Sequence, residues 1–195
     1  MEKIESVYPK LQHKIDDSFD FLHFKNFDIE ELSIHVNKFT SEWDIDDVRQ
    51  NSGLAQSETN VFWVTALASP LFNPPFAVYL VNEYHEVNNF ILPILEAMEE
   101  KTNGLVARAI LARLPAKSRV HPHRDSGRLF EISRRFHIPV ITNENCSVVV
   151  AGREVFMGAG ECWEISNLRT HSAVNAGDTD RVHLIFDIIP KHLIP

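Results

Sequence analysis

Two stretches in the first half of the chain carry apolar residues at the spacing of an amphipathic helix. In residues 28–39 the apolar positions fall near one face, acidic residues occupy the first turn, and Asp28 can cap the helix. In residues 84–100 a second apolar stripe predicts another helix, which the dipeptide Asn103-Gly104 ends. Pro93 lies within this stretch and is compatible with a helix only in the first turn of a regular segment.

The second half of the chain, from Leu105 onward, alternates short β-forming runs with turns. The runs are LVARAILARL, RRFHIPVIT, SVVVAG, REVFM, ECWEIS and RVHLIFDII, and the breaks between them include NEN, GAG and NAGD. In the first half, NVFWVTAL at residues 60–67 predicts a strand and PLFNPP at 70–75 predicts a loop. Many short strands with such breaks are typical of an antiparallel sandwich or barrel, including the jelly roll of cupins.

These patterns predict a mainly β protein with helices. We expect residues 1–104 to form a layer of helices and strands packed on a double-stranded β-helix, or jelly roll, made by residues 105–195. No linker, repeat or low-complexity tract separates the two parts, so the prediction is one structural domain with an N-terminal helical layer.

Composition and charge mainly serve to exclude classes of partner. The 195 residues carry a formal net charge of −8, which argues against nucleic acid as a partner because phosphate binding relies on clustered lysine and arginine. No apolar run reaches the ~18 residues that a membrane span needs. The N-terminal MEKIESVYPK lacks the apolar core and cleavage site of a signal peptide. We therefore expect a cytoplasmic protein with no membrane partner.

The stretch VHPHRDSG, residues 120–127, concentrates side chains that can bind a metal. His123 and Asp125 are two residues apart, and in a strand such residues point to the same side. The pair alone is a weak signal, because a polar turn in which the aspartate satisfies the histidine has the same sequence. His121 has the same parity and is an alternative ligand, although Pro122 disturbs a regular strand here.

Two residues further along complete the chemistry that this pair can support. His171 supplies a second histidine, and Arg181 opens the run RVHLIFD. Two histidines and one carboxylate on one face of a metal form the facial triad of non-haem Fe(II) oxygenases, which leaves coordination positions open. An arginine in the same barrel can bind a carboxylate through two parallel hydrogen bonds, as the distal end of a dicarboxylate co-substrate requires.

Four sequence blocks resemble the aspartyl/asparaginyl β-hydroxylase family of 2-oxoglutarate-dependent oxygenases. They are PHRD (122–125), RFHIPV (135–140), GECWEISN (160–167), and a histidine followed further on by RVHL (181–184). The likeness runs from about residue 83 to residue 190 and is only loose before it. It implies a double-stranded β-helix that uses Fe(II), 2-oxoglutarate and O2 to hydroxylate an unactivated C–H bond.

The resemblance also implies roles for individual residues. Three of them match the iron ligands of the family: His123, Asp125 and His171. Arg181 would bind the distal carboxylate of 2-oxoglutarate, and Arg135 and His137 match family positions near the co-substrate carboxylates.

The triad carboxylate bears on the substrate. The best-known vertebrate aspartyl hydroxylases of the family lack it, whereas this chain keeps Asp125, as do small bacterial members that include the proline cis-4-hydroxylases. This favours a free amino acid or a related small molecule as the substrate. Two alternatives stay open: a peptidyl aspartyl/asparaginyl β-hydroxylase, and a non-catalytic cupin that binds a metal or a small acid.

Position along the chain predicts roles for further residues. His183 shares the strand face of Arg181 and is expected to touch 2-oxoglutarate. Trp163 is expected in the layer behind the ligands, and Asn167 and Ser172 can orient a ligand histidine. Five other arginines are expected mostly on solvated faces, with one or two meeting a substrate carboxylate: Arg108, Arg113, Arg119, Arg124 and Arg128. The oligomeric state stays open.

Overall fold

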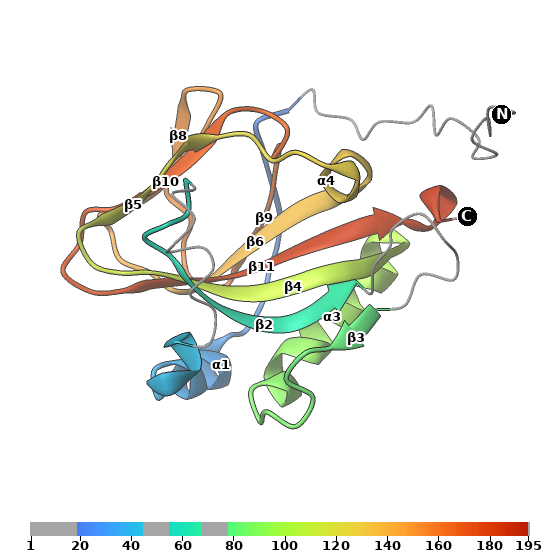
Figure 1. Ribbon diagram of the computed structural model, residues 1–195, viewed down its shortest axis with the longest axis horizontal. Helices are drawn as coiled ribbons and strands as arrows, with labels where there is room; N and C mark the ends of the chain where they lie inside the picture. The colour runs from blue at the N-terminus through green and yellow to red at the C-terminus, as the bar shows by residue number, and fades with distance from the viewer. Residues whose placement is uncertain (1–18, 45–54, 68–77, 195) are drawn as a thin grey trace, which may run out of the picture.

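Two antiparallel β-sheets that face each other dominate the computed structural model, which describes residues 19–44, 55–67 and 78–194 (Figure 1). The larger sheet contains β1 (Phe21–Asn26), β2 (Asn60–Leu67), β3 (Val78–Leu80), β4 (Gly104–Leu114), β6 (Arg134–Ile141), β9 (Glu161–Ile165) and β11 (Arg181–Pro190). The smaller sheet contains β5 (Ser118–His123), β7 (Cys146–Val150), β8 (Arg153–Val155) and β10 (His171–Asn175). The helices are α1 (Glu30–Val36), α3 (Asn88–Thr102) and α4 (Arg128–Ile132), with 3-10 turns η1 (Ser41–Asp44) and η2 (Lys191–Leu193).

The strand order shows how the two halves of the chain combine. The larger sheet runs β1-β9-β6-β11-β4-β2-β3 and the smaller sheet runs β5-β10-β7-β8. The predicted mainly β fold with a double-stranded β-helix is confirmed. The division at residue 104 stays a prediction, and β1, β2 and β3 lie in the same sheet as the later strands.

The predicted helices are present with different limits. α1 is shorter than the apolar stripe suggests, and its N-cap is Ile29, although the Asp28 side chain accepts a hydrogen bond from the Glu30 N–H (3.1 Å). α3 begins at Asn88, so Pro93 lies beyond its first turn, where the helix lacks the hydrogen bond that a proline cannot donate. Asn103 ends α3 in the left-handed conformation (φ 48°), as the sequence predicts.

The predicted strand at 60–67 is confirmed, and the apolar runs after residue 104 all contribute strands. Three short strands were not foreseen: β1, β3 and β10. β1 and β10 mix polar with apolar residues and β3 has only three residues, so the pairing partner rather than the local sequence determines these strands. The loop predicted at 70–75 lies outside the described residues.

β11 separates the protein core from the space between the sheets. It lies between β6 and β4, and ten of its residues alternate between the two faces of the sheet. Four apolar side chains point to the outer face, where α1 and α3 cover the sheet: Val182, Leu184, Phe186 and Ile188 (Figure 1). The opposite face carries Arg181, His183, Ile185 and Asp187 and points toward the smaller sheet.

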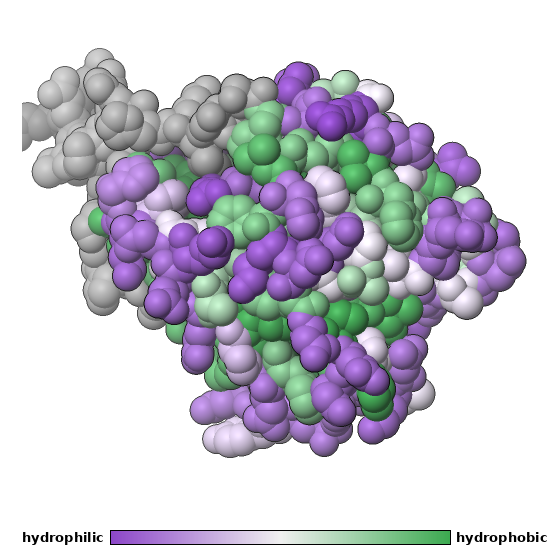
Figure 2. Space-filling view, turned by 180° about the vertical axis from the view of Figure 1, so that it is seen from behind, coloured by the Kyte–Doolittle hydropathy of each residue, from purple (hydrophilic) through white to green (hydrophobic). Residues whose placement is uncertain are grey.

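The surface is mixed, and no membrane-spanning helix is present in the described parts of the chain. On the side turned away from the viewer of Figure 1, polar residues surround separate apolar patches (Figure 2). None of the helices in the described ranges is both long and apolar enough to cross a bilayer.

The segment between β1 and α1 packs closely against Gly160, the residue before β9. Its φ is +79°, and a Cβ on it would lie 2.4 Å from the carbonyl oxygen of Phe27. We expect Gly160→Ala to lower the free energy of unfolding by at least about 2 kcal/mol, because strain and collision add. Gly152 (φ +85°) has nothing within 4 Å of such a Cβ, so Gly152→Ala should cost only about 1 kcal/mol in urea denaturation. Equal losses would contradict this reading.

Candidate metal centre

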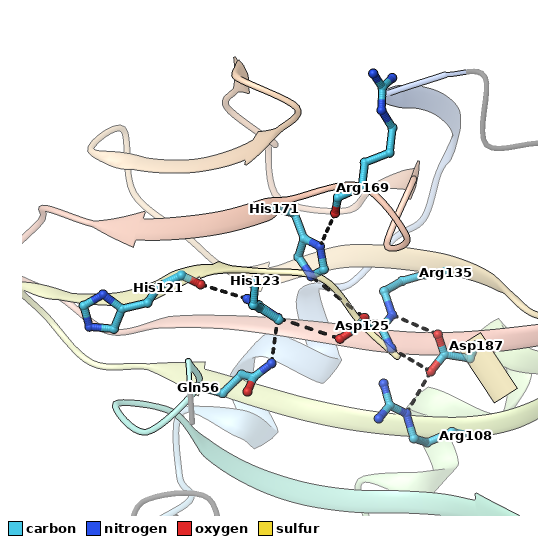
Figure 3. A network of polar contacts seen from close by, with 9 residues as sticks. All are labelled: Gln56, Arg108, His121, His123, Asp125, Arg135, Arg169, His171 and Asp187. Atoms are coloured by element: carbon cyan, nitrogen blue, oxygen red, sulfur yellow. Dashed lines mark hydrogen bonds and ion pairs between the residues drawn. The ribbon is translucent and has the colours of Figure 1, made fainter. Parts of the chain in front are cut away.

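The three residues of the predicted triad come together between the two sheets. β5 ends at His123 and β10 begins at His171, and the two histidines are paired across these strands. Asp125 lies in the turn after β5, where its N–H donates to the carbonyl of Asn167 (3.1 Å). The candidate ligand atoms of the three side chains all lie within 4.8 Å of one another (Figure 3).

The three residues lie together as predicted, but the strand geometry from which this was predicted is partly wrong. Asp125 does not share a strand face with His123, because the strand has already ended. The bond from its N–H to Asn167 in the next segment brings it back toward the histidines. The alternative ligand His121 lies outside the cluster, with its exposed ring 3.6 Å from Glu58 (Figure 3).

Backbone carbonyls fix the tautomer of both histidines. Nδ1 of His123 lies 2.8 Å from the carbonyl oxygen of His121, and Nδ1 of His171 lies 3.0 Å from that of Arg169 (Figure 3). A carbonyl only accepts, so each Nδ1 carries the proton and each Nε2 keeps its lone pair. The Nε2 atoms lie 3.7 Å and 3.8 Å from the oxygens of Asp125.

These residues fit a divalent metal such as Fe(II). Two neutral imidazoles and one carboxylate on one side form the donor set of non-haem iron sites, and no cysteine is among them. Burial lowers the pKa of His171, outweighing the neighbouring Asp125, so the ring is neutral and available as a ligand. The side-chain amide of Gln56 donates to Nε2 of His123 (2.6 Å), and a metal at this atom would displace it.

A row of buried charges holds the triad carboxylate in place. Arg108 on β4, Asp187 on β11 and Arg135 on β6 are direct neighbours across three strands. Asp187 accepts from Nε of both arginines at 2.8 Å, and Arg135 also pairs with Asp125 (Figure 3). Asp125 is therefore connected to the centre of the larger sheet through a single guanidinium.

The row stays ionised although it is buried. Burial alone would raise the pKa of Asp187, but the adjacent Arg108 and Arg135 lower it below its usual range. The pKa of Arg135 is raised, because Asp187 and Asp125 together outweigh the effect of burial. Arg108 is therefore not on a solvated face as the sequence suggested: it joins this row and its side chain is only 13% exposed.

Arg181 and His137 line the other end of the cavity, and His183 contacts both of them. Arg181 is buried, and its Nε donates to Nε2 of His183 (2.9 Å). No carboxylate among the described residues pairs with it, and burial lowers its pKa to about 10. His137 lies 3.4 Å from His183 between Nδ1 atoms, and its buried Nε2 has no partner in the described part of the chain.

A cavity of about 370 Å³ connects the triad to Arg181. Both sheets line it, together with α4 and the turn before β2. Besides Arg135, five of the residues predicted to hold the metal or the co-substrate line it: His123, Asp125, His137, His171 and Arg181. His183, which was also predicted to touch the co-substrate, is not in the lining, and this contact stays a prediction. Arg135 also lines it, but its guanidinium is engaged by Asp125 and Asp187, so its contact with a co-substrate stays a prediction.

The residues expected behind the ligands have other contacts. Trp163 donates from Nε1 to Glu161 (2.9 Å) and does not line the cavity. Asn167 acts through its main-chain carbonyl, whereas its side-chain nitrogen is buried without a partner among the described residues. Ser172 lines the cavity. The predicted orientation of a ligand histidine by Asn167 or Ser172 is instead performed by the carbonyls of His121 and Arg169.

Sequence reasoning missed Asp187 and Gln56. Asp187 could have been noticed as the one acidic residue in the apolar run RVHLIFDII, on the same strand face as Arg181. Gln56 gave no signal, because it lies in a polar turn far along the chain from His123.

Comparison with known proteins identifies the family. A sequence model of the family described as aspartyl/asparaginyl beta-hydroxylase matches residues 78–190, which is more than half of the chain. This chain belongs to the aspartyl/asparaginyl β-hydroxylase family.

One relative and two solved structures are also similar to this chain. The chain is 31% identical over 77 residues to L-proline cis-4-hydroxylase of Rhizobium meliloti (strain 1021); the match spans 40% of this chain and 28% of that relative. The viral collagen prolyl hydroxylase of Paramecium bursaria Chlorella virus-1, solved as a 2OG complex, has a TM-score of 0.55 at 9% identity, covering 90% of this chain and 98% of its own. A 2OG-Fe(II) oxygenase family oxidoreductase from Burkholderia pseudomallei has a TM-score of 0.51 at 14% identity, covering 87% and 94%. These structures share the fold of this family member.

Replacement of Asp187 tests the contribution of the charged row to stability. Asp187→Asn leaves two buried arginines without their shared carboxylate, so we expect the free energy of unfolding to fall by about 3 kcal/mol or more. Urea denaturation of the metal-free protein measures this. The matched control is Asp178→Asn, whose carboxylate is 90% exposed beside Lys117 and should cost less than about 0.5 kcal/mol. Similar losses in the two variants would contradict the role of the row.

The stability of the protein should also depend on two buried histidines. Burial and the charge of Arg181 lower the pKa of His137 and His183 well below the usual range. Their stabilising contribution is complete above the unfolded pKa of about 6.5 and is lost as pH falls below it, by about 1.4 kcal/mol per pH unit for each histidine. His183→Gln should therefore give a shallower fall in unfolding free energy between pH 7 and pH 5. An unchanged slope would count against this assignment.

Proposed function

We propose that this family member is a 2-oxoglutarate-dependent hydroxylase that uses Fe(II) and O2 to hydroxylate an unactivated C–H bond of a free amino acid or a related small molecule. The observation that carries the proposal is one cavity with a histidine–aspartate–histidine cluster at one side and a buried, anion-free guanidinium, Arg181, at the other.

Arg181 is the strongest single argument for an anionic co-substrate. A buried cation without a counter-ion is costly, and the nearest polar partner of Arg181 is the neutral ring of His183. A carboxylate entering the cavity would supply the missing charge and two oxygen acceptors for the planar guanidinium. The unpartnered Nε2 of His137 offers a further polar contact on the same path. 2-Oxoglutarate has the required carboxylates at its two ends.

The triad residues would hold the iron. His123 and His171 present Nε2 lone pairs, and Asp125 presents a carboxylate that Arg135 holds in position. When bound, Fe(II) supplies the activation of O2, and the net reaction converts 2-oxoglutarate to succinate and CO2 while one oxygen atom enters the C–H bond of the substrate. The chain itself needs no general base for this conversion.

The apolar side chains of the cavity have a separate role. Ile110 and Ile185 lie between the charged row and Arg181, and Leu114 lies beside Arg181. They limit the water that reaches the centre of the cavity and strengthen the electrostatic contacts within it. The size of the cavity fits a co-substrate with a small second molecule rather than a folded domain. The similarity to a proline hydroxylase points in the same direction.

The proposal is tested by anaerobic titration of the protein with Fe(II) and then 2-oxoglutarate, following the charge-transfer absorption band and the binding isotherms. His171→Ala should weaken metal binding at least about 100-fold, because one of three ligands is lost. Arg181→Met should keep the metal affinity and weaken 2-oxoglutarate about 100-fold or more.

The controls are an exposed histidine and an exposed arginine away from the cavity, His192→Ala and Arg153→Met, which should leave both affinities unchanged. Succinate release that requires Fe(II) distinguishes an enzyme from a protein that only binds a metal or an acid. Full 2-oxoglutarate affinity in Arg181→Met would overturn the assignment of this residue.

A further inference from the structure

The cavity is strongly positive in a protein that is acidic as a whole. Among the described residues, the lining contains four arginines and one acidic residue, Asp125. The arginines are Arg108, Arg124, Arg135 and Arg181. The chain as a whole carries a formal charge of −8, so this local excess is opposite to the overall balance.

The charges of the cavity do not cancel when the proposed ligands are present. Arg108, Asp187, Arg135 and Asp125 form a row that is neutral as a set. Arg181 and Arg124 are left over. Fe(II) adds two positive charges and 2-oxoglutarate adds two negative ones, so the loaded cavity keeps an excess of two positive charges. A neutral amino acid leaves this excess uncompensated, and an anionic substrate reduces it.

Arg108 offers the inner position for a negative group. Its Nε is bound to Asp187, while its two terminal nitrogens have no partner among the described residues. The ring of Phe130 lies 5.1 Å from the centre of the guanidinium and holds it against the cavity wall. Arg108 is paired with Asp187, six positions along β11 from Arg181, so it serves a molecule at the opposite end from the co-substrate carboxylate.

Arg124 offers a second position near the opening. It lies between His123 and Asp125, and its Nε donates to the hydroxyl of Thr170 (3.1 Å), the residue before His171. This bond anchors an otherwise exposed guanidinium beside the metal ligands and leaves its terminal nitrogens without a partner in the described ranges. Two anchored guanidiniums with free donors therefore border the part of the cavity that 2-oxoglutarate does not occupy.

We infer that the substrate is an acidic small molecule, a dicarboxylic amino acid or a similar compound with two anionic groups, with one carboxylate bound by Arg108 and the second anionic group bound by Arg124. The inference rests on the proposed function and adds the charge class of its substrate. It separates this chain from an enzyme for a neutral amino acid such as proline.

The experiment uses the protein loaded anaerobically with Fe(II) and 2-oxoglutarate. Formation of the charge-transfer band tests the proposed function by itself. The loaded protein is then titrated with pairs that differ only in charge, L-aspartate against L-asparagine and L-glutamate against L-glutamine, and with L-proline. We expect at least one acidic member to perturb the band with an affinity at least about 10-fold above its amide, the difference of one favourable ion pair.

Three variants assign the two positions. Arg124→Gln should remove the preference for the acid over its amide while keeping the 2-oxoglutarate affinity. Arg119→Gln is the matched control, because this arginine is exposed on β5, the strand that ends just before Arg124, lies outside the cavity lining and loses the same charge. Arg108→Lys, which keeps a cation beside Asp187, should weaken the acid and its amide alike, since both share the carboxylate that Arg108 binds.

The outcomes are distinct. A normal band with equal affinity for acids and amides, or with no response to any acidic compound, overturns the inference and leaves the proposed function standing. Absence of the band overturns the proposed function and the inference with it. An acid preference that survives Arg124→Gln overturns the assignment of Arg124.

Discussion

The buried ion pairs between Asp187 and its two neighbouring arginines set the geometry on which the rest of the site depends. Asp187 is completely buried, and its carboxylate binds Arg108 and Arg135 from the strands on either side. Such a group is tolerated only if it is fully paired, so the three strands must keep their register. Because Arg135 also pairs with Asp125, the position of this candidate metal ligand follows from the pairing of the strands at the centre of the sheet.

The alternation of side chains along β11 gives the two faces of this strand different roles. One face of β11 is apolar and packs under the helices, and the other carries Arg181, His183 and Asp187, of which Arg181 lines the cavity. The rigid core on one side therefore limits the movement of polar groups on the other. This arrangement places the buried guanidinium of Arg181 and the histidine–aspartate–histidine cluster on a single framework.

The sequence predicted the periodic elements and the residues of the triad more fully than their surroundings. The strand at 60–67 and the helix that Asn103 ends could be predicted because local pattern decides them. The row of Arg108, Asp187 and Arg135 could not, because its members are brought together by strand register, which one sequence does not reveal. The turn that carries Asp125 was mistaken for strand, since the bond that shapes it comes from the distant Asn167.

The Nδ1 hydrogen bonds of the two candidate ligand histidines are made to the main chain. The carbonyls of His121 and Arg169 exist whatever side chains occupy those positions, so point mutations there leave the ring orientation intact. A cluster aligned by the main chain tolerates sequence change: neighbouring side chains can be replaced in evolution while the two candidate ligand rings keep their orientation.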